Sequence, residues 1–495
     1  MVNIELLKEQ NKWWIAKEKI DEDVNIEKLN KVKYVWHPEV IDSFDTEKDI
    51  IYTLRGSRQV GKTTALKLLI KRLLTKNQKE NICYLTCNNI DTHRELIEVL
   101  QIYLEWVNNA GRRYIFIDEI TFVKNWTRAI KHLADIGLLQ KCTIILTGSN
   151  SHDLKYEVER MPGRRGEDPV LDKILFPVTF REYMGFVEPD MVSRFTPLEK
   201  AADFSRRLLP QTVRERSSLT GFTADSAKNN YVFYKKELRK YLDNFLLTGG
   251  FIQAINSFAS DGRISIDIYH QYLSWILGDL AKLGRKETFS RQIFEQVIGS
   301  MTANIGFDTI AKKTSIGSHL TVRDYLDVME SNFILKILYQ IDINKKTGML
   351  RKTKKIYFQD VFLFWVFFGY VFGLSDYFES SKSKLNDAIL KSKLIEDLIM
   401  SHLMRMEDSV NWSNKVFFFR AANQNEVDFV VRLSNDELVP IEVKYKDGVS
   451  FKDFRNLEKI NKSKGIVISK EDFLADGDKF IFPAEVFLLV FDKPF

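Results

Sequence analysis

A nine-residue loop near the N-terminus constrains the fold of this chain more than any other feature. It lies after an apolar run that begins at Ile50 and before a helical run that ends at Leu74. Glycines let consecutive backbone N–H groups curl around phosphate oxygens, while the following lysine and threonine supply a point charge and a Mg²⁺ ligand. The pattern predicts a strand, a phosphate-binding loop and a helix. The predicted nucleotide-binding residues are Gly56, Ser57, Arg58, Gln59, Val60, Gly61, Lys62, Thr63 and Thr64, with Thr63 also predicted to bind Mg²⁺.

A strand-like run further along the chain ends in two carboxylates. Four apolar residues (114–117) precede Asp118 and Glu119, which is typical of a buried parallel strand whose carboxyl end opens at a ligand crevice. After a phosphate-binding loop, this pattern predicts that Asp118 holds Mg²⁺ through water and that Glu119 is the catalytic residue that orients the attacking water. A further strand ends at Thr147, and Ser149 beyond it is predicted either to sense the γ-phosphate or to form a plain turn.

Length and composition describe a folded, multidomain protein. At 495 residues the chain is too long for one hydrophobic core, and the usual size of a domain predicts about three domains. Cys83, Cys87 and Cys142 are best explained as small buried side chains in a reducing cytoplasm. The N-terminus has no charged-then-apolar leader, so we expect a cytoplasmic protein. The apolar stretch 361–374 is too short to cross a bilayer, which favours a buried helix over a peripheral membrane contact.

The region from 307 to 358 has the pattern of a small DNA-binding module. The expected order is helix, turn, helix and two strands joined by a basic loop, which predicts a winged helix. Its second helix would face a DNA groove and its loop would contact phosphates; a protein–protein module and a merely solvated loop are the alternatives. The expected elements are helices at 307–311 and 320–329, a turn at 316–318, and strands at 333–341 and 355–358. The helix residues predicted to face DNA are Ser318, His319, Thr321 and Arg323, the core residues are Leu320, Tyr325, Val328 and Met329, and the loop cations are Lys345, Lys346, Arg351, Lys352, Lys354 and Lys355.

The last region predicts a different chemistry. Strand-like runs at 416–420, 426–431 and 439–444 form a hairpin in which Asp428 is expected opposite Glu442, with Lys444 on the same face as Glu442. Two carboxylates bind Mg²⁺ or Mn²⁺, and a lysine beside them helps to activate water for phosphodiester hydrolysis. The predicted catalytic residues are Asp428, Glu442 and Lys444, and the predicted metal ligands are Asp428, Glu442 and, from a preceding helix, Glu396. The alternative is a half-exposed hairpin with ordinary outward charges.

The order of these segments resembles a known family. The runs "GSRQVGKTT", "YIFIDEI", "ILTGSNS", "PVTFREY", "YLDNFLLTGGFIQAI", "KIYFQDVFL" and "EVDFVV" with "IEVKY" follow as in archaeal and bacterial AAA-type (AAA+ or STAND-related) ATPases with a C-terminal domain of unknown function. The resemblance implies an ATPase domain, a winged helix and a PD-(D/E)xK nuclease-like fold, with Lys62, Thr63, Asp118 and Glu119 serving ATP. Arg164, in a Gly-Arg pair, becomes a candidate γ-phosphate contact in its own or a neighbouring subunit, with Arg160 and Arg165 as alternatives.

The expected architecture is therefore multidomain α/β. It comprises an N-terminal strap at 1–48 with Trp13 and Trp14 as packing anchors, a parallel-sheet AAA ATPase core at 49–185, a helical lid or insertion at 186–258, a winged helix at 264–377 and a mixed α/β nuclease-like domain at 380–495. The arginine-rich insertion at 187–230 has no assigned role.

The expected function is an ATP-hydrolysing enzyme that acts on duplex or branched DNA with a Mg²⁺- or Mn²⁺-dependent nuclease-like domain, ATP controlling the arrangement of its domains. The alternative is a STAND-like signalling ATPase whose last domain only binds DNA or a protein partner, and a mobile-element or toxin-related factor is less favoured. Either ATPase allows a homo-oligomer.

Overall fold

The computed structural model describes residues 4–107, 111–148, 154, 157, 161, 163–194, 224–406, 415–421, 425–433 and 436–490. Within these ranges the chain divides into two compact units. Unit 1 contains 1–176, together with the short segment Ser331–Phe333, and unit 2 contains most of the chain from Pro177 onward. Each unit has its own sheet and is described by itself.

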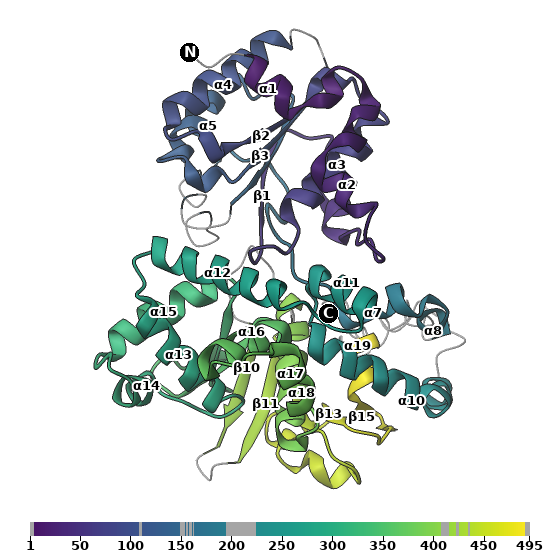
Figure 1. Ribbon diagram of the computed structural model, residues 1–495. Coiled ribbons are helices and arrows are strands. Elements are labelled where there is room, and N and C mark those ends of the chain that lie inside the picture. The colour runs from purple at the N-terminus through teal and green to yellow at the C-terminus, as the bar shows by residue number, and fades with distance from the viewer. Residues whose placement is uncertain are drawn as a thin grey trace. The chain divides into compact units, whose positions relative to one another are not determined.

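Unit 1 is built on a parallel sheet with the strand order β2-β3-β4-β1-β5. The strands are almost entirely buried because helices cover both faces, which explains their near-continuous apolar runs. In Figure 1, α2 and α3 lie on one side of the strands and α1, α4 and α5 on the other. The strands are β1 (Ile50–Arg55), β2 (Ile82–Thr86), β3 (Arg113–Asp118), β4 (Cys142–Thr147) and β5 (Asp172–Ile174), and the helices are α1 (Ile4–Gln10), α2 (Val24–Leu29), α3 (Lys62–Leu74), α4 (His93–Trp106) and α5 (Trp126–Asp135).

The N-terminal segment protects the edge strand β2. Trp13 and Trp14 are buried, and both indole N–H groups donate to the Ile82 carbonyl, at 3.0 and 2.8 Å. The Asn11 side chain pairs with the backbone of Tyr84 on both sides, donating to its carbonyl at 2.8 Å and accepting from its N–H at 2.6 Å. These bonds satisfy edge groups that would otherwise be open to another strand. The three cysteines are buried and free.

Unit 2 begins with helices that the sequence placed elsewhere. Helix α7 (Phe180–Val187) and the long α10 (Ala224–Thr248) both pack against the C-terminal helix α19 (Ala484–Val490), and α10 also packs against α16 (Val361–Phe372). The structure groups the described part of 177–258 with unit 2. The expected ATPase boundary at 185 and the expected lid at 186–258 stay predictions. Other helices here are α8 (Pro189–Arg194), α11 (Ile252–Asp261), α12 (Ile266–Lys282), α13 (Glu287–Gly299) and α17 (Tyr377–Lys384).

Helix α16 is the apolar stretch noted in the sequence, and nearly all of it is buried. Its N-cap Asp360 accepts bonds from the Phe362 N–H at 2.8 Å and from the Gly250 N–H at 2.9 Å, which ties the helix to the turn after α10. Among the described residues no single helix is long and apolar enough to cross a bilayer; α16 and α17 meet the criterion only as a pair bent by 110°.

The expected helix–turn–helix and strand pair is present in unit 2. Helices α14 (Phe307–Lys313) and α15 (His319–Ser331) precede the antiparallel strands β6 (Leu335–Tyr339) and β9 (Lys354–Phe358), and a short hairpin, β7 (Ile341–Asp342) and β8 (Thr347–Gly348), lies between them. Tyr325, Val328 and Met329 are buried as expected, whereas Leu320 is 60% exposed. The expectation that Leu320 joins the core is wrong because it lies in the first, outward-facing turn of α15.

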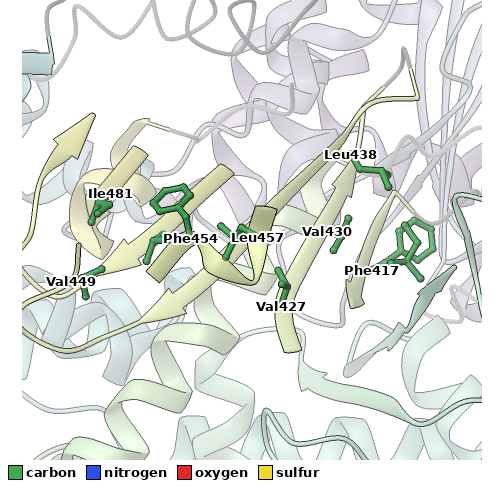
Figure 2. Close-up of a cluster of buried hydrophobic side chains, with 10 residues drawn as sticks. Phe417, Val427, Val430, Leu438, Val449, Phe454, Leu457 and Ile481 are labelled. Carbon is green, nitrogen blue, oxygen red and sulfur yellow. The ribbon is translucent and has the colours of Figure 1, made fainter. Parts of the chain in front are cut away.

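The second sheet has the order β10-β11-β12-β13-β15-β14. A buried apolar cluster fills one face, with Phe454 and Leu457 from two 3₁₀ turns (Phe451–Arg455 and Leu457–Lys459) meeting strand residues such as Val427 and Ile481, as Figure 2 shows. Helix α18 (Ala388–Leu403) contacts β9 and β12. The strands are β10 (Val416–Arg420), β11 (Glu426–Arg432), β12 (Leu438–Lys444), β13 (Lys464–Ser469), β14 (Leu474–Asp476) and β15 (Asp478–Pro483).

The two domains expected at 264–377 and 380–495 are parts of this one unit. Gln340 bridges Phe418 of β10, and its side-chain amide donates to the Arg420 carbonyl at 2.9 Å. The segment that leads into the β7–β8 hairpin is therefore attached to β10, at the edge of the second sheet. These segments are far apart in sequence, and no local sequence pattern predicts their contact.

Candidate functional site

The phosphate-binding loop lies at the carboxyl edge of the first sheet, between β1 and α3. Two of its glycines have backbone conformations that other residues rarely adopt, with φ of 155° at Gly56 and 104° at Gly61. A Cβ on Gly56 would lie 2.3 Å from the Leu175 carbonyl oxygen, so no side chain fits there. Gly61 is the N-cap of α3 and turns the chain into the helix. The amino end of α3 therefore follows directly on the glycine-containing loop, which is the arrangement that binds anions in phosphate-loop proteins.

Lys62 is the buried cation of this loop. Its Nζ donates to the carbonyls of Gly56 and Ser57, both at 3.0 Å, and the side chain is only 7% exposed. These bonds hold the ammonium against the first two carbonyls of the loop.

Asp118 is the centre of the polar network at the end of β3. Its Oδ2 accepts bonds from the Thr63 hydroxyl at 2.7 Å and the Tyr84 hydroxyl at 2.8 Å, and its Oδ1 accepts from the Thr147 hydroxyl. Thr147 Oγ1 also accepts the Glu119 N–H at 3.3 Å. Burial, followed by the nearby Asp118 charge, raises the pKa of Tyr84 well above its ordinary value, so its hydroxyl keeps its proton for this bond.

Tyr84 and Thr147 were not recognised from the sequence. Strand β4 lies between β1 and β3, and the parallel register sets Thr147 beside Leu54, the residue before the last of β1. A hydroxyl residue at the end of an apolar strand was a usable signal for Thr147, because carboxyl ends of parallel strands meet at one edge. Tyr84 lies inside β2, where an aromatic residue ordinarily indicates core, and its role is visible only from its partner.

The contact between Thr63 and Asp118 fits a magnesium site. Mg²⁺ prefers oxygen ligands, and a loop threonine with a strand aspartate is the usual pair in phosphate-loop proteins. Thr63 Oγ1 and Asp118 Oδ2 are already neighbours at 2.7 Å. These two side chains would therefore hold the ion.

The remaining residues predicted to contact nucleotide are not placed at this site. Ser149 and Arg160 lie outside the described residues. Arg164 pairs with Asp135, Nε to Oδ1 at 2.7 Å. Arg165 is buried, donates to the Ile51 carbonyl at 3.1 Å and pairs with Asp172 at 2.8 Å.

Ile51 is at the amino end of β1, whereas the phosphate loop follows the carboxyl end. Arg164 is adjacent to Arg165 and pairs with Asp135, the last residue of α5, and a contact of Arg164 with the γ-phosphate of its own subunit stays a prediction. A contact with a neighbouring subunit stays a prediction.

The predicted DNA-facing residues are partly available. His319 and Arg323 on α15 are 57% and 61% exposed at the side chain and pair only at the surface, with Asp308 and Asp327. Lys345, Arg351 and Lys352 are exposed on the basic loop, and Ser318, Thr321 and Lys346 are partly exposed.

The two last cations of the run are not solvated. Lys354 is 6% exposed and donates to the Leu350 and Lys352 carbonyls, both at 2.7 Å, and Lys355 is 1% exposed. The expectation that both contact phosphates is wrong because β9 turns them into unit 2.

Two of the three carboxylates predicted for the nuclease-like site, Glu396 and Asp428, lie around one point with Glu426, which was not predicted, and a lysine occupies that point. Lys355 Nζ lies 2.8 Å from Asp428 Oδ1, 3.1 Å from Glu396 Oε1 and 2.7 Å from Glu426 Oε1. Asp428 Oδ2 accepts the Val443 N–H at 2.9 Å. Lys444, predicted to be catalytic, instead pairs with Asp453 at 2.8 Å.

Two carboxyl groups of this region have raised pKa values. Burial, reinforced by the Asp428 charge, raises the pKa of Glu396 to about 7 and that of Glu442 to about 9. Glu442 Oε2 is buried and has no hydrogen-bond partner among the described residues. Within the described ranges no group of three or more His, Cys, Asp or Glu side chains is arranged to hold a metal ion. The residues present therefore do not fit the Mg²⁺ or Mn²⁺ predicted for them.

Three family models match successive parts of the chain. Residues 48–184 match a model described as an AAA domain, and 239–370 and 391–487 match two domains of unknown function, DUF8612 and DUF4143. Together with the loop geometry, the first match shows that the N-terminal part is an AAA-type P-loop ATPase domain.

Two proteins of Methanocaldococcus jannaschii resemble the chain over most of its length. The uncharacterized protein MJ1544 is 24% identical over 84% of this chain and 79% of its own length, and MJ1637 is 23% identical over 96% and 89%. Among solved structures, the Walker-type ATPase PABY2304 of Pyrococcus abyssi aligns with a TM-score of 0.37 at 14% identity, covering 71% of this chain and 95% of that one. The ORC1 protein of Aeropyrum pernix, solved in complex with DNA, aligns with a TM-score of 0.27 at 14% identity, covering 70% and 93%. Structural likenesses at these TM-scores support no statement about this chain.

Proposed function

We propose that this protein hydrolyses ATP and binds DNA, with the nucleotide controlling how its two units are arranged. The observation that supports hydrolysis most directly is the contact of Thr63 with Asp118, beside a loop that holds Lys62. Thr63 begins α3 and Asp118 ends β3, so the sheet brings a metal-binding pair and the phosphate loop to one edge.

The chain's own residues divide the chemistry among them. The backbone N–H groups of 56–63 and the Lys62 ammonium bind the phosphates, and Glu119 orients the attacking water and accepts its proton. Thr147 holds the start of the Glu119 turn, since its hydroxyl accepts the Glu119 N–H at 3.3 Å. Mg²⁺ bound by Thr63 and Asp118 would neutralise charge that develops on the phosphates.

Two substitutions test this assignment. Lys62→Ala should abolish both nucleotide binding and turnover, because the phosphates lose their buried cation. Glu119→Gln should keep nucleotide binding and lose turnover, because the amide cannot take the proton. Phosphate release and equilibrium binding of a fluorescent ATP analogue separate the two, and hydrolysis that survives either change would refute the assignment.

DNA binding is supported by the exposed cations of α15 and the basic loop. Each phosphate that a protein neutralises steepens the salt dependence of binding. Changing Arg323, Arg351 and Lys352 together to alanine should weaken binding of duplex or branched DNA and flatten its salt dependence in fluorescence anisotropy. Lys382, exposed on α17, provides the matched control. An unchanged salt slope in the triple variant would refute this surface.

A signalling ATPase that does not depend on DNA is the competing proposal. In such a switch Arg164 would contact the nucleotide of a neighbouring subunit, after leaving its ion pair with Asp135. DNA-stimulated turnover would support the first proposal. Turnover indifferent to DNA, with an oligomer whose size follows the bound nucleotide, would support the second.

Metal-dependent cleavage of DNA, expected from the sequence, is not favoured here, because Lys355 pairs with the carboxylates of Glu396 and Asp428 that would bind the metal ion. No cleavage step follows from the residues as they stand, because Lys355 lies between the carboxylates. Labelled duplex, single-stranded and four-way-junction DNA with Mg²⁺ or Mn²⁺, with and without ATP, tests it beside an Asp428→Ala/Lys444→Ala control. Cutting that is lost in the control would establish a nuclease.

A further inference from the structure

The residue that departs most from its sequence context is Lys355. Lys355 belongs to β9 and lies opposite Leu338 in the β6–β9 ladder. The preceding residue, Lys354, exchanges backbone hydrogen bonds with Ile305 at 2.8 and 2.9 Å. The Lys355 side chain leaves the ladder toward α18 and β11. There it reaches one carboxylate of α18 and two of β11.

The ammonium and its partners match in number. A lysine ammonium has three N–H donors, and Lys355 has three carboxylate oxygens within 3.1 Å, from Glu396, Glu426 and Asp428. Tyr357, two residues on and on the same face of β9, donates to the same Glu396 oxygen at 2.7 Å. Each N–H group of the Lys355 ammonium thus has one carboxylate oxygen available as its acceptor.

The contacts of Lys355 are those of a charged ammonium. Three carboxylate oxygens, from Glu396, Glu426 and Asp428, lie 3.1, 2.7 and 2.8 Å from its Nζ. The cluster therefore has a cation at its centre.

We propose that Lys355 is the resident cation of this acidic site, taking the place that a divalent metal ion would have among Glu396, Glu426 and Asp428. The ammonium both neutralises the carboxylates and joins β9 to α18 and β11. On this proposal the second sheet is a metal-free platform that holds the helix–turn–helix segment, and its acidic residues are structural. The proposal does not depend on ATP hydrolysis or on DNA binding.

A titration of the full-length protein with Mn²⁺, without nucleotide, tests the proposal, with free Mn²⁺ followed by electron paramagnetic resonance. The wild type should show no Mn²⁺ site that Asp428→Asn removes. Lys355→Met should create one, because the three carboxylates of Glu396, Glu426 and Asp428 then lack their cation. Adding Asp428→Asn to that variant should remove the site again.

Lys354→Met is the matched control, since Lys354 is the adjacent buried lysine, but its ammonium donates to two carbonyls and lies over the Phe307 ring instead of meeting carboxylates. It should create no Mn²⁺ site. Heat stability gives a second readout: Mn²⁺ should raise the Tm of Lys355→Met and leave that of Lys354→Met unchanged. If Lys355→Met does not fold, Lys355→Gln, which keeps donors without the charge, replaces it. A wild-type Mn²⁺ site that depends on Asp428, or a folded Lys355 variant that binds none, would overturn the proposal.

Discussion

Thr147 offers the sharpest test of how the ATPase site is organised. It is fully buried at the end of β4, and its single hydroxyl donates to Asp118 Oδ1 and accepts the Glu119 N–H at 3.3 Å. Thr147→Val keeps nearly the same shape and removes both bonds. Asp118 then retains partners only on Oδ2, from Thr63 and Tyr84.

The expected loss follows from the charge of one partner. A hydrogen bond to a charged group contributes about 1.5–3 kcal/mol. If that stabilisation is needed in the transition state, kcat should fall roughly 10- to 100-fold, at about 1.4 kcal/mol for each factor of ten. Nucleotide affinity should stay nearly unchanged, because the Thr147 hydroxyl bonds to Asp118 and Glu119, whereas Lys62 and the loop backbone are the groups proposed to bind the phosphates.

The assay pairs steady-state phosphate release with equilibrium binding of a fluorescent ATP analogue. Thr147→Ser, which keeps the hydroxyl, should restore most of the rate, and Tyr84→Phe, which removes one bond to the other oxygen of Asp118, should lower it less. Full kcat in Thr147→Val, or a loss of affinity that matches the loss of rate, would refute the positioning argument.

Three further predictions follow from particular contacts. Gly56→Ala should abolish nucleotide binding in the same fluorescence assay, because its Cβ would lie 2.3 Å from the Leu175 oxygen, while Gly185→Ala, with no neighbour within 4 Å, should bind normally. Lys67→Met should destabilise unit 1 to urea by about 1–3 kcal/mol, because it breaks a buried pair with Asp23 at 3.1 Å, and Asp23→Asn in that background should cost little more. Burial lowers the pKa of His402 to about 3, below its unfolded value, so the folded state loses stability as pH falls below about 6.5. At pH 5 the Phe180 amide, which donates to His402 Nε2 at 3.2 Å, should lose roughly 30-fold of its hydrogen-exchange protection, and His402→Gln should show no such loss; parallel profiles would contradict this.

Local patterns were sufficient for much of the architecture. Three features can be recognised from a few residues each, because strand burial and glycine turns depend on short segments of the chain. They are the loop at Gly56, the strand that ends in Asp118 and the hairpin around Asp428. The strands expected at 416–420, 426–431 and 439–444 correspond to β10, β11 and β12 with small shifts. Element type and order were therefore open to sequence reasoning.

Contacts between residues far apart in the sequence could not be predicted in this way. Lys354 and Lys355 belong to a run of cations that favours a solvated loop, and only the pairing of β9 and the position of α18 turn them inward. Likewise, Arg164 follows a glycine in a way that suggested a phosphate contact, and only the tertiary structure pairs it with Asp135, the last residue of α5.

By itself, then, the sequence determined a phosphate-binding loop, its acidic strand and a second, acidic sheet, because each depends on glycine conformations and alternating burial within one segment. The tertiary structure alone decided which charges meet. It placed Thr147 and Tyr84 on Asp118, and it set Lys355 among three carboxylates. The physical reason is that the energy of a charge inside a protein depends on the groups that packing brings around it. The residues next to it along the chain do not determine which groups these are.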